Sequence, residues 1–334
     1  MKTLDLNRIK RTIKNFNKAS VLVVGDLMLD EFVWGKVSRI SPEAPVPVVW
    51  TTSESVMPGG ASNVAHNIKA LGGTVYLSGV VGNDSRGALL VDELEKRGVN
   101  ASGVVRDQER PTTLKTRVIA HNQQVVRIDK EKVDNISPDS IDRMLEYASG
   151  IIKDIDAVVI EDYGKGVIVP RFVEKLIRLA RRHKKIVTVD PKENHFRLYR
   201  NATCITPNLY EAARAVGLVS RDDLPVEDIG GHLIKQLNSD VLLITLGEEG
   251  MCVFEKGAKP TRIPTMAQDV YDVSGAGDTV ISTYTLAVVS GAKNIEAAHI
   301  ANCAAGIVVG KVGIAVATQK ELIEKIKKEV KRVR

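Results

Sequence analysis

Short apolar runs alternate with segments of helical periodicity along most of this chain. Each run has the length of a buried strand, and several are followed by apolar residues at helical spacing. The runs that we predict as strands are Val21–Gly25, Thr74–Val81, Ala157–Ile160, Ile186–Val189, Ala202–Thr206 and Val241–Leu246. Strands that alternate with helices form parallel sheets covered by helices. The pattern therefore predicts an α/β fold with a doubly wound, mostly parallel sheet flanked by helices.

Amphipathic segments predict the helices that cover this sheet. Apolar residues recur at helical spacing between Leu6 and Phe16, with basic residues between them, so a first helix should pack on the domain; binding to a membrane surface is the alternative. Further helices are predicted at Ile168–Lys184, Thr279–Ser290, Ile295–Val309 and Glu321–Val333. We see no linker, and we predict a single domain over residues 1–334.

Polar residues follow the predicted strands where each strand ends. Asp26 follows the first strand, Glu161-Asp162 and Asp190-Pro191-Lys192 follow two later ones, and Pro207-Asn208 follows a third. Ligands of parallel sheets bind beyond the carboxyl ends of strands. This edge should hold the functional site, with Asp26 placed to accept hydrogen bonds from sugar hydroxyl groups.

Two β-rich segments do not fit this alternation. Residues 31–52 contain short apolar runs separated by prolines, which sheets tolerate at their edges. Residues 112–129 carry a similar pattern around a turn at His121-Asn122. We predict that the two segments form a small sheet outside the main one, which acts as a lid. Edge hairpins of the main sheet are the alternative.

Composition narrows the class of protein. The chain has 334 residues, of which 44% are hydrophobic and only 4% aromatic, so aliphatic side chains must fill the core. The formal net charge is +6, but basic residues gather in residues 1–18 and 320–334 without interleaved aromatic residues. A nucleic-acid partner is therefore not expected.

Cysteine usage and hydropathy indicate the compartment. Cys204, Cys252 and Cys303 lack metal-binding spacing and are expected to be small buried residues. We find neither a signal peptide nor an apolar run near the roughly 20 residues of a membrane span. We predict a cytoplasmic protein with no membrane partner.

The stretch Val270–Thr279 carries the strongest chemical signal. Gly275, Ala276 and Gly277 form a small-residue turn directly before a predicted helix, where free backbone N–H groups can bind an anion. Asp278 follows at once, and a carboxylate beside a phosphate can take a proton from an attacking hydroxyl group. The motif favours phosphoryl transfer to an alcohol. A glycine-rich helix cap with an acidic first turn is the alternative.

A second glycine-rich motif, Pro58–Asn63, is expected to open a helix that runs through Leu71. Gly59 and Gly60 would permit the backbone to approach a ligand closely. Asn63 could cap this helix or reach that ligand. The motif alone is a weak signal.

Together, P-G-G-A-S-N from Pro58 and D-V-S-G-A-G-D-T from Asp272 resemble the two signatures of the ribokinase-like (PfkB) carbohydrate kinase family. The segments Val23–Val49, His121–Asp129, Asp162–Gly166, Asp190–Lys192 and Thr206–Glu211 resemble one subgroup, the D-glycero-β-D-manno-heptose 7-phosphate kinases. The resemblance runs from about residue 20 to about residue 318. Ser274 stands where threonine is usual, and His121 where arginine is common. Many members continue into a nucleotidyltransferase domain, so we predict the stand-alone kinase form.

The resemblance implies a ribokinase-like fold with a β-sheet lid. Exposed sheet edges are normally covered, so we expect the lids of two copies to pair into a homodimer. The resemblance also implies transfer of phosphate from ATP, with Mg²⁺, to the anomeric hydroxyl group of D-glycero-D-manno-heptose 7-phosphate. The product would be the 1,7-bisphosphate, in the synthesis of ADP-heptose for lipopolysaccharide or another surface glycan. A kinase for fructose phosphate or ribose, and a non-catalytic nucleotide-binding regulator, are the alternatives.

The resemblance also assigns roles on the nucleotide side. Asp278 would be the general base, with Gly275, Ala276 and Gly277 around the migrating phosphoryl group. Asn208 and Glu211 would position Mg²⁺, with Glu211 acting through water, unless they are only a helix cap pair. The remaining residues expected to contact ATP are Lys192, Thr245, Gly247, Gly250 and Asn302.

On the sugar side, the resemblance implies hydrogen bonds to the sugar hydroxyl groups from Asp26, Gly59, Gly60 and Asn63. A terminal phosphate calls for cations, which Arg39, Arg117, Arg127 and Lys165 could supply. These cations could instead pair with acids such as Glu43 or Asp129. Asp272 would cap its turn or help to hold a monovalent cation such as K⁺.

Overall fold

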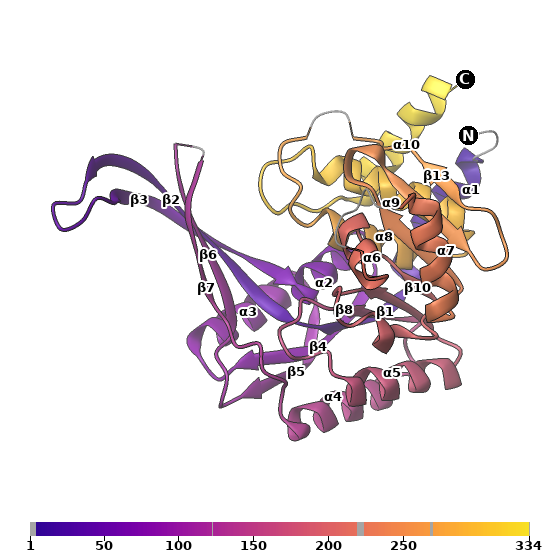
Figure 1. The fold of residues 1–334 in the computed structure, drawn as a ribbon, viewed down its shortest axis with the longest axis horizontal. Coiled ribbons are helices and arrows are strands. Elements are labelled where there is room, and N and C mark those ends of the chain that lie inside the picture. Colours follow the sequence, from indigo (N-terminus) through magenta and orange to yellow (C-terminus); the bar gives the residue numbers. More distant parts are fainter. Residues whose placement is uncertain (1–4, 122, 219–223, 268–269, 334) are drawn as a thin grey trace.

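The computed structural model describes residues 5–121, 123–218, 224–267 and 270–333. Its main element is a nine-stranded sheet with the order β13-β12-β11-β10-β9-β8-β1-β4-β5 (Figure 1). All neighbours from β5 to β11 are parallel, whereas β12 and β13 add antiparallel strands at one edge. The strands are β1 (Ser20–Gly25), β4 (Thr74–Gly82), β5 (Asn100–Asp107), β8 (Ala157–Glu161), β9 (Ile186–Asp190), β10 (Cys204–Ile205), β11 (Val241–Thr245), β12 (Met251–Glu255) and β13 (Thr261–Ile263).

Alternate side chains of the central strands pack into two separate hydrophobic cores, one on each face of the sheet. Val21 and Val23 of β1 pack into one cluster, whereas Leu22 and Val24 pack into the other. This follows from the strand period of two, which sends successive side chains to opposite faces. Because both faces are covered, the central strands read as continuous apolar runs.

The helices divide between these two faces. One cluster takes residues from α1 (Leu6–Lys14), α2 (Ala61–Ala70), α3 (Ser85–Lys96), α8 (Ala276–Val289), α9 (Asn294–Val308) and α10 (Gln319–Val333). The other takes residues from α4 (Pro138–Ile151), α5 (Pro170–Arg182), α6 (Leu209–Ala215) and α7 (Val226–Leu237). Short 3₁₀ helices are η1 (Asn15–Lys18), η2 (Phe196–Tyr199) and η3 (Gly247–Glu249). The predicted packing of the first helix on the domain is present, because Ile9 and Ile13 are buried.

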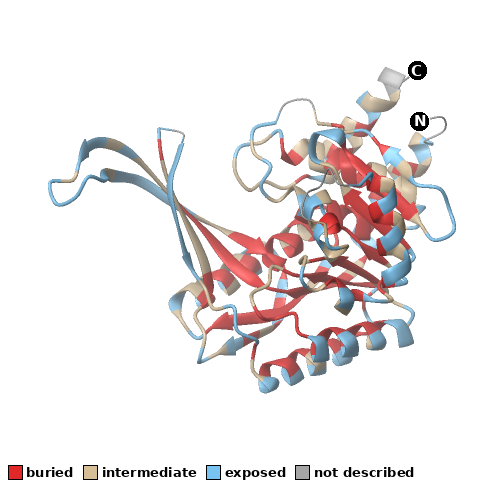
Figure 2. Ribbon diagram, viewed as in Figure 1, coloured by how far each residue is buried: buried red, intermediate tan, exposed pale blue. Residues whose placement is uncertain are grey.

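A second sheet of four strands, in the order β3-β2-β6-β7, projects from the main body (Figure 1). Its strands are β2 (Leu27–Ile40), β3 (Pro47–Gly60), β6 (Thr113–Ala120) and β7 (Gln123–Lys130). The β2–β6 pair is parallel and the other two pairs are antiparallel. The small sheet predicted outside the main one is therefore present, and its far end is largely exposed (Figure 2). Of the predicted turn at His121-Asn122, Asn122 lies outside the described residues.

Two boundaries differ from the prediction. Pro58–Gly60 completes β3 rather than opening a helix, and α2 begins at Ala61. The backbone turns between strand and helix at Gly60, whose φ of 56° suits glycine. The sequence pattern also missed α3, β5, α4 and α7, because their polar faces interrupt the apolar runs.

Two further findings concern burial. No helix in the described part of the chain is long and apolar enough to cross a membrane. All three cysteines are free and buried, as predicted. Burial raises the pKa of Cys204 and Cys303 to about 12, so both thiols stay protonated and behave as apolar groups.

Candidate active site

A cavity of about 280 Å³ opens where β8, β9 and β11 end and α8 begins. This is the edge at which ligands of parallel sheets bind. Its lining residues come from the segments that follow the strands and from the turn before α8. They are Glu161, Asp162, Tyr163, Asp190, Pro191, Lys192, Thr206, Asn208, Glu211, Thr245, Val273, Gly275, Ala276, Gly277 and Asp278.

Asp278 lies in the first turn of α8 and is buried within this cavity. The helix starts after Gly275, whose φ of 75° belongs to the left-handed region that glycine adopts without strain. Two neutral donors hold the carboxylate. Asn63 Nδ2 donates to one oxygen at 2.6 Å, and the Tyr163 hydroxyl group donates to the other at 3.0 Å. The carboxyl group fixed in this way lies in the same cavity as the small-residue turn Gly275–Gly277.

Two effects act on the pKa of Asp278 in opposite directions. Burial raises its pKa, whereas the hydrogen bonds from Asn63 and Tyr163 lower it. Charge on Asp278, followed by burial, raises the pKa of Tyr163 well above its usual value, so Tyr163 remains a protonated donor. The net effect is a raised pKa in a buried carboxyl group, which suits a group that accepts a proton.

Glu161 and Asp190 bring two more carboxyl groups to Asp278. One oxygen from each of the three lies within 4.8 Å of the others. Burial, then repulsion between the acids, raises the pKa of Glu161 well above its usual value, and burial does the same for Asp190. Glu161 Oε2 is buried without a hydrogen-bond partner among the described residues. Oxygen ligands of this kind suit Mg²⁺, so this cluster could hold such a cation.

Asn208 and Glu211 line the cavity at the start of α6. Asn208 Oδ1 accepts from the Glu211 backbone N–H at 2.9 Å, and Glu211 Oε2 accepts from the Asn208 N–H at 3.0 Å. The helix cap pair considered from the sequence is thus present. It leaves the other Glu211 oxygen free of the capping bonds, and burial raises the pKa of that carboxyl group. Lys192 also lines the cavity, and its Nζ lies 2.8 Å from Glu193.

Of the other residues expected to contact ATP, Thr245 lines the cavity. Gly247, Gly250 and Asn302 are absent from the described lining. Gly247 begins η3 with open space around its Cα, whereas Gly250 packs against the backbone of Ile263. Asn302 Nδ2 donates to the carbonyl oxygen of Pro264 at 2.7 Å.

The residues expected to bind the sugar already have protein partners. Asp26 accepts backbone N–H groups from Tyr163 at 2.8 Å, Lys165 at 3.0 Å and Val167 at 3.2 Å. It thereby fixes the loop that follows β8, and burial, then the charge of Asp162, raises its pKa to about 6.

The two glycines of this motif pack without room for a side chain. A Cβ on Gly59 would lie 2.2 Å from Asp30 Oδ2, and one on Gly60 would lie 2.5 Å from the Asp26 carbonyl oxygen. Asn63 reaches Asp278 directly. The motif therefore packs closely at its glycines and supplies the amide group that contacts Asp278.

The predicted cations of the second sheet are mostly paired with acids. Arg127 contacts both oxygens of Asp129, at 2.9 and 3.0 Å, and Lys165 Nζ lies 2.6 Å from Glu131. Arg117 pairs with Asp30. The pairing with neighbouring acids that the sequence left open is thus realised for these three cations.

Asp272 behaves as the cap of its turn. Its Oδ1 accepts the backbone N–H of Ser274 at 2.9 Å. Both Asp272 and the neighbouring Tyr271 donate backbone hydrogen bonds to the carbonyl oxygen of Val309. The capping role is therefore present, and its second carboxylate oxygen is not used in this bond.

Sequence reasoning gave no role to several residues that line the cavity. Glu161, Tyr163 and Asp190 are the principal ones. A signal was available, because Glu161 and Asp190 end predicted strands. Asp162, beside them, accepts from His195 Nδ1 at 2.7 Å and from the Tyr199 hydroxyl group, so it anchors the following loops.

Comparison with known proteins places the chain. Residues 18–321 match the family described as pfkB family carbohydrate kinase. The bifunctional protein HldE of Desulfatibacillum aliphaticivorans is 46% identical over 307 residues, which is 92% of this chain and 63% of that protein. HldE of Geobacter sulfurreducens is 43% identical over 320 residues, 96% of this chain and 65% of that protein. The chain therefore spans just under two thirds of these relatives.

Solved structures have the same fold. Arabidopsis thaliana ribokinase, complexed with ribose and ATP, superposes with a TM-score of 0.71 at 20% identity, over 92% of this chain and 99% of that one. Phosphofructokinase-2 from Escherichia coli, in complex with potassium, gives a TM-score of 0.76 at 19% identity, over 94% and 99%. The predicted ribokinase-like fold is confirmed.

Proposed function

This chain belongs to the pfkB family of carbohydrate kinases, and from that premise we propose that it phosphorylates the anomeric hydroxyl group of D-glycero-D-manno-heptose 7-phosphate. ATP would be the donor, and the products would be the 1,7-bisphosphate and ADP. The observation that carries the chemistry is the Asp278 carboxylate, held by Asn63 and Tyr163 directly beside the Gly275–Gly277 turn.

In the proposed reaction, the sugar hydroxyl group gives its proton to Asp278 while its oxygen attacks the γ-phosphorus of ATP. The new O–P bond forms as the bond from the γ-phosphorus to the bridging β,γ-oxygen breaks, and ADP leaves with that oxygen. Backbone N–H groups of Gly275 and Gly277 stabilise the charge on the transferred group, whereas that of Ala276 donates to the Val273 carbonyl oxygen at 3.2 Å. Lys192, at the mouth of the same cavity, neutralises phosphate charge. When bound, Mg²⁺ would shield the charge of the ATP phosphates; Glu161 and Asp190 are placed to hold it, with Glu211 acting through water.

Two lines support the heptose phosphate as acceptor. The subgroup motifs run through the lid segments and the loop after β8, and the HldE relatives match the chain along nearly its whole length. The positive charge of Lys115 and Lys165 near the base of the second sheet also supports an acceptor that carries a phosphate. Burial, then repulsion from Lys165, lowers the pKa of Lys115, although Asp129 lies 3.9 Å from its Nζ. A phosphate close to Lys115 and Lys165 would add negative charge beside both ammonium groups.

A homodimer through the second sheet is the proposed assembly, with this sheet acting as the lid. Large apolar side chains are exposed there: Trp50 is 75% accessible, Ile40 61% and Ile128 57%. Exposed apolar surface on a projecting sheet favours burial against a partner, and a second copy would present the same surface. Sedimentation measurements at several concentrations test this, and a strictly monomeric chain would contradict it.

A coupled assay for ADP release tests the substrate. The kcat/KM for heptose 7-phosphate should exceed that for unphosphorylated heptose by at least about thirtyfold, since a charged contact is lost in the latter. Fructose 6-phosphate and ribose serve as the rival acceptors. Equal values for the two heptoses would remove the phosphate pocket, whereas no ADP release with any sugar would favour the non-catalytic regulator.

The remaining parts of the proposal concern ions and location. K⁺ near Asp272 is proposed because this carboxylate retains an oxygen outside its turn bond. Replacing KCl by NaCl in the same assay should lower kcat if the ion contributes. A cytoplasmic location and the stand-alone kinase form stay predictions.

A further inference from the structure

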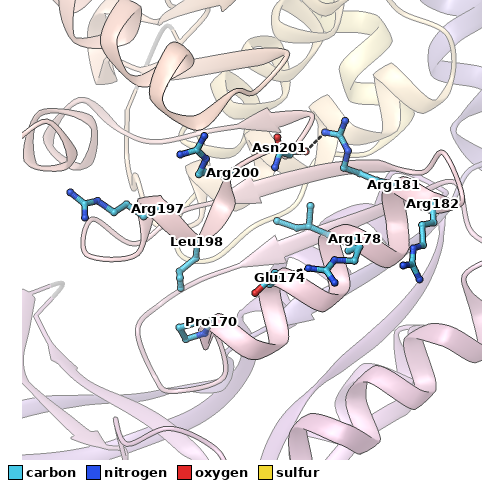
Figure 3. Close-up of a pocket in the computed structure, with 10 residues that line it drawn as sticks. Pro170, Glu174, Arg178, Arg181, Arg182, Arg197, Leu198, Arg200 and Asn201 are labelled. Atoms are coloured by element: carbon cyan, nitrogen blue, oxygen red, sulfur yellow. Dashed lines mark hydrogen bonds and ion pairs between the residues drawn. The ribbon is translucent and has the colours of Figure 1, made fainter.

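A second cavity, larger than the catalytic one, lies along α5. Its volume is about 620 Å³, and it runs between α5 and the segment that leads from η2 to β10 (Figure 3). It shares no described lining residue with the cavity around Asp278. Any ligand held here would therefore occupy a place separate from the proposed reaction.

Arginine dominates the lining of this groove. The helix contributes Arg178, Arg181 and Arg182, and the opposite segment contributes Arg197 and Arg200. Figure 3 shows these side chains on both sides of the groove, with one acid, Glu174, among them.

The local partners use only part of this charge. Arg178 pairs with Glu174 at 2.5 Å, and Arg181 Nη1 donates to the Asn201 carbonyl oxygen at 2.8 Å. Arg182, Arg197 and Arg200 have no hydrogen-bond or ion-pair partner within the ranges that the structure describes.

All five arginines are exposed, so water and salt screen the repulsion between them, but one carboxylate does not balance their charge. The excess positive charge attracts an anion into the groove. The guanidinium fork matches the oxygens of a phosphate group with two parallel hydrogen bonds. Apolar surface from Pro170, Ile177 and Leu198 forms the rest of the groove and suits the body of an organic molecule.

We propose that this groove binds a small molecule that carries two or more phosphate groups. The volume lies within the range of about 300–1,000 Å³ that is usual for small-molecule sites. Arginines on two facing walls would engage separate phosphates of one ligand. A nucleic acid would also meet these charges, but the described groove lining contains no aromatic residue on which a base could stack.

Pyrophosphate is the probe, and titration calorimetry of the full chain is the measurement. Because pyrophosphate can also enter the catalytic cavity, the experiment is run in parallel on a Lys192→Ala variant. The proposal expects a binding event that Lys192→Ala retains. The double variant Arg197→Ala/Arg200→Ala should weaken that event by at least about thirtyfold.

A matched control removes the same charge elsewhere. The double variant Arg143→Ala/Arg171→Ala takes two exposed arginines from α4 and α5 that do not line the groove. It should change pyrophosphate affinity by less than about threefold, the effect expected from screened charges at a distance. Circular dichroism checks that each variant is folded.

Three results would overturn the proposal. Loss of all binding in Lys192→Ala would place pyrophosphate in the catalytic cavity alone. Equal weakening by the two double variants would reduce the effect to general surface charge. Tighter binding of a single-stranded oligonucleotide than of pyrophosphate, lost in Arg197→Ala/Arg200→Ala, would assign the groove to nucleic acid.

Discussion

Replacing Asp278 by asparagine should separate activity from stability. The change keeps the shape of the side chain, and the amide oxygen can still accept from Asn63 Nδ2. The hydroxyl group of Tyr163 can rotate to accept from the new amide. The variant should therefore fold, but it cannot take a proton from the sugar, and kcat should fall by about 10²–10⁴-fold.

The thermal stability of Asp278→Asn should increase, although its activity falls. Asp278 contributes one of three carboxyl groups within 4.8 Å of one another, and repulsion from it contributes to the raised pKa of Glu161 and Asp190. Removing that charge relieves this repulsion. The thermal midpoint should therefore rise.

Steady-state ADP release with heptose 7-phosphate measures the first effect, and thermal unfolding by circular dichroism measures the second. ATP affinity, measured by calorimetry, should change little. Asp154→Asn is the matched control, because Asp154 is exposed and does not line the catalytic cavity. If Asp278→Asn keeps more than about a tenth of kcat, Asp278 is not the base. If it unfolds at lower temperature, the repulsion argument fails.

Three further changes test other parts of the structure. Tyr163→Phe removes a donor that lowers the pKa of Asp278, so the acidic limb of kcat/KM should move to higher pH; an unmoved limb would show that the contact does not tune the base. Gly25→Ala places a Cβ 2.0 Å from a carbonyl oxygen of β8 and should cost about 1–3 kcal/mol in urea unfolding, whereas Gly150→Ala, with open space in α4, should stabilise slightly. Trp50→Glu should weaken the proposed dimer in sedimentation without lowering the thermal midpoint, and an unchanged dimer would move the interface elsewhere.

Local chemistry made much of the fold and part of the site predictable. Short continuous apolar runs such as Val21–Gly25, bounded by polar residues, are typical of strands buried on both faces. The Gly275–Gly277 turn and Asp278 are contiguous, so their joint presence in one cavity required no knowledge of tertiary structure. Asp190 and Asn208 each follow a predicted strand, and the carboxyl ends of parallel strands lie at one edge of a sheet, so both residues were expected at that edge.

What the sequence could not supply is register. The β8–β9 ladder sets Glu161 opposite Asp190, and a shift of one residue would have turned one of the two side chains to the other face. The ion pairs of the predicted cations could be foreseen only as an alternative. The structure shows that Arg127 pairs with Asp129 and that Lys165, in the loop after β8, pairs with Glu131.

The two glycine motifs are far apart in sequence, and the fold explains why both are needed. Strand β3 ends at Gly60 and α2 begins at Ala61, so Asn63 lies in the first turn of a helix that directly follows a strand of the second sheet. Its amide then crosses to Asp278, and a Cβ on Gly275 would lie 2.9 Å from that amide nitrogen. Glycine at 275 thus serves two purposes, since it starts α8 and also leaves room for the donor that holds the base. The first motif therefore positions the carboxylate that the second motif supplies.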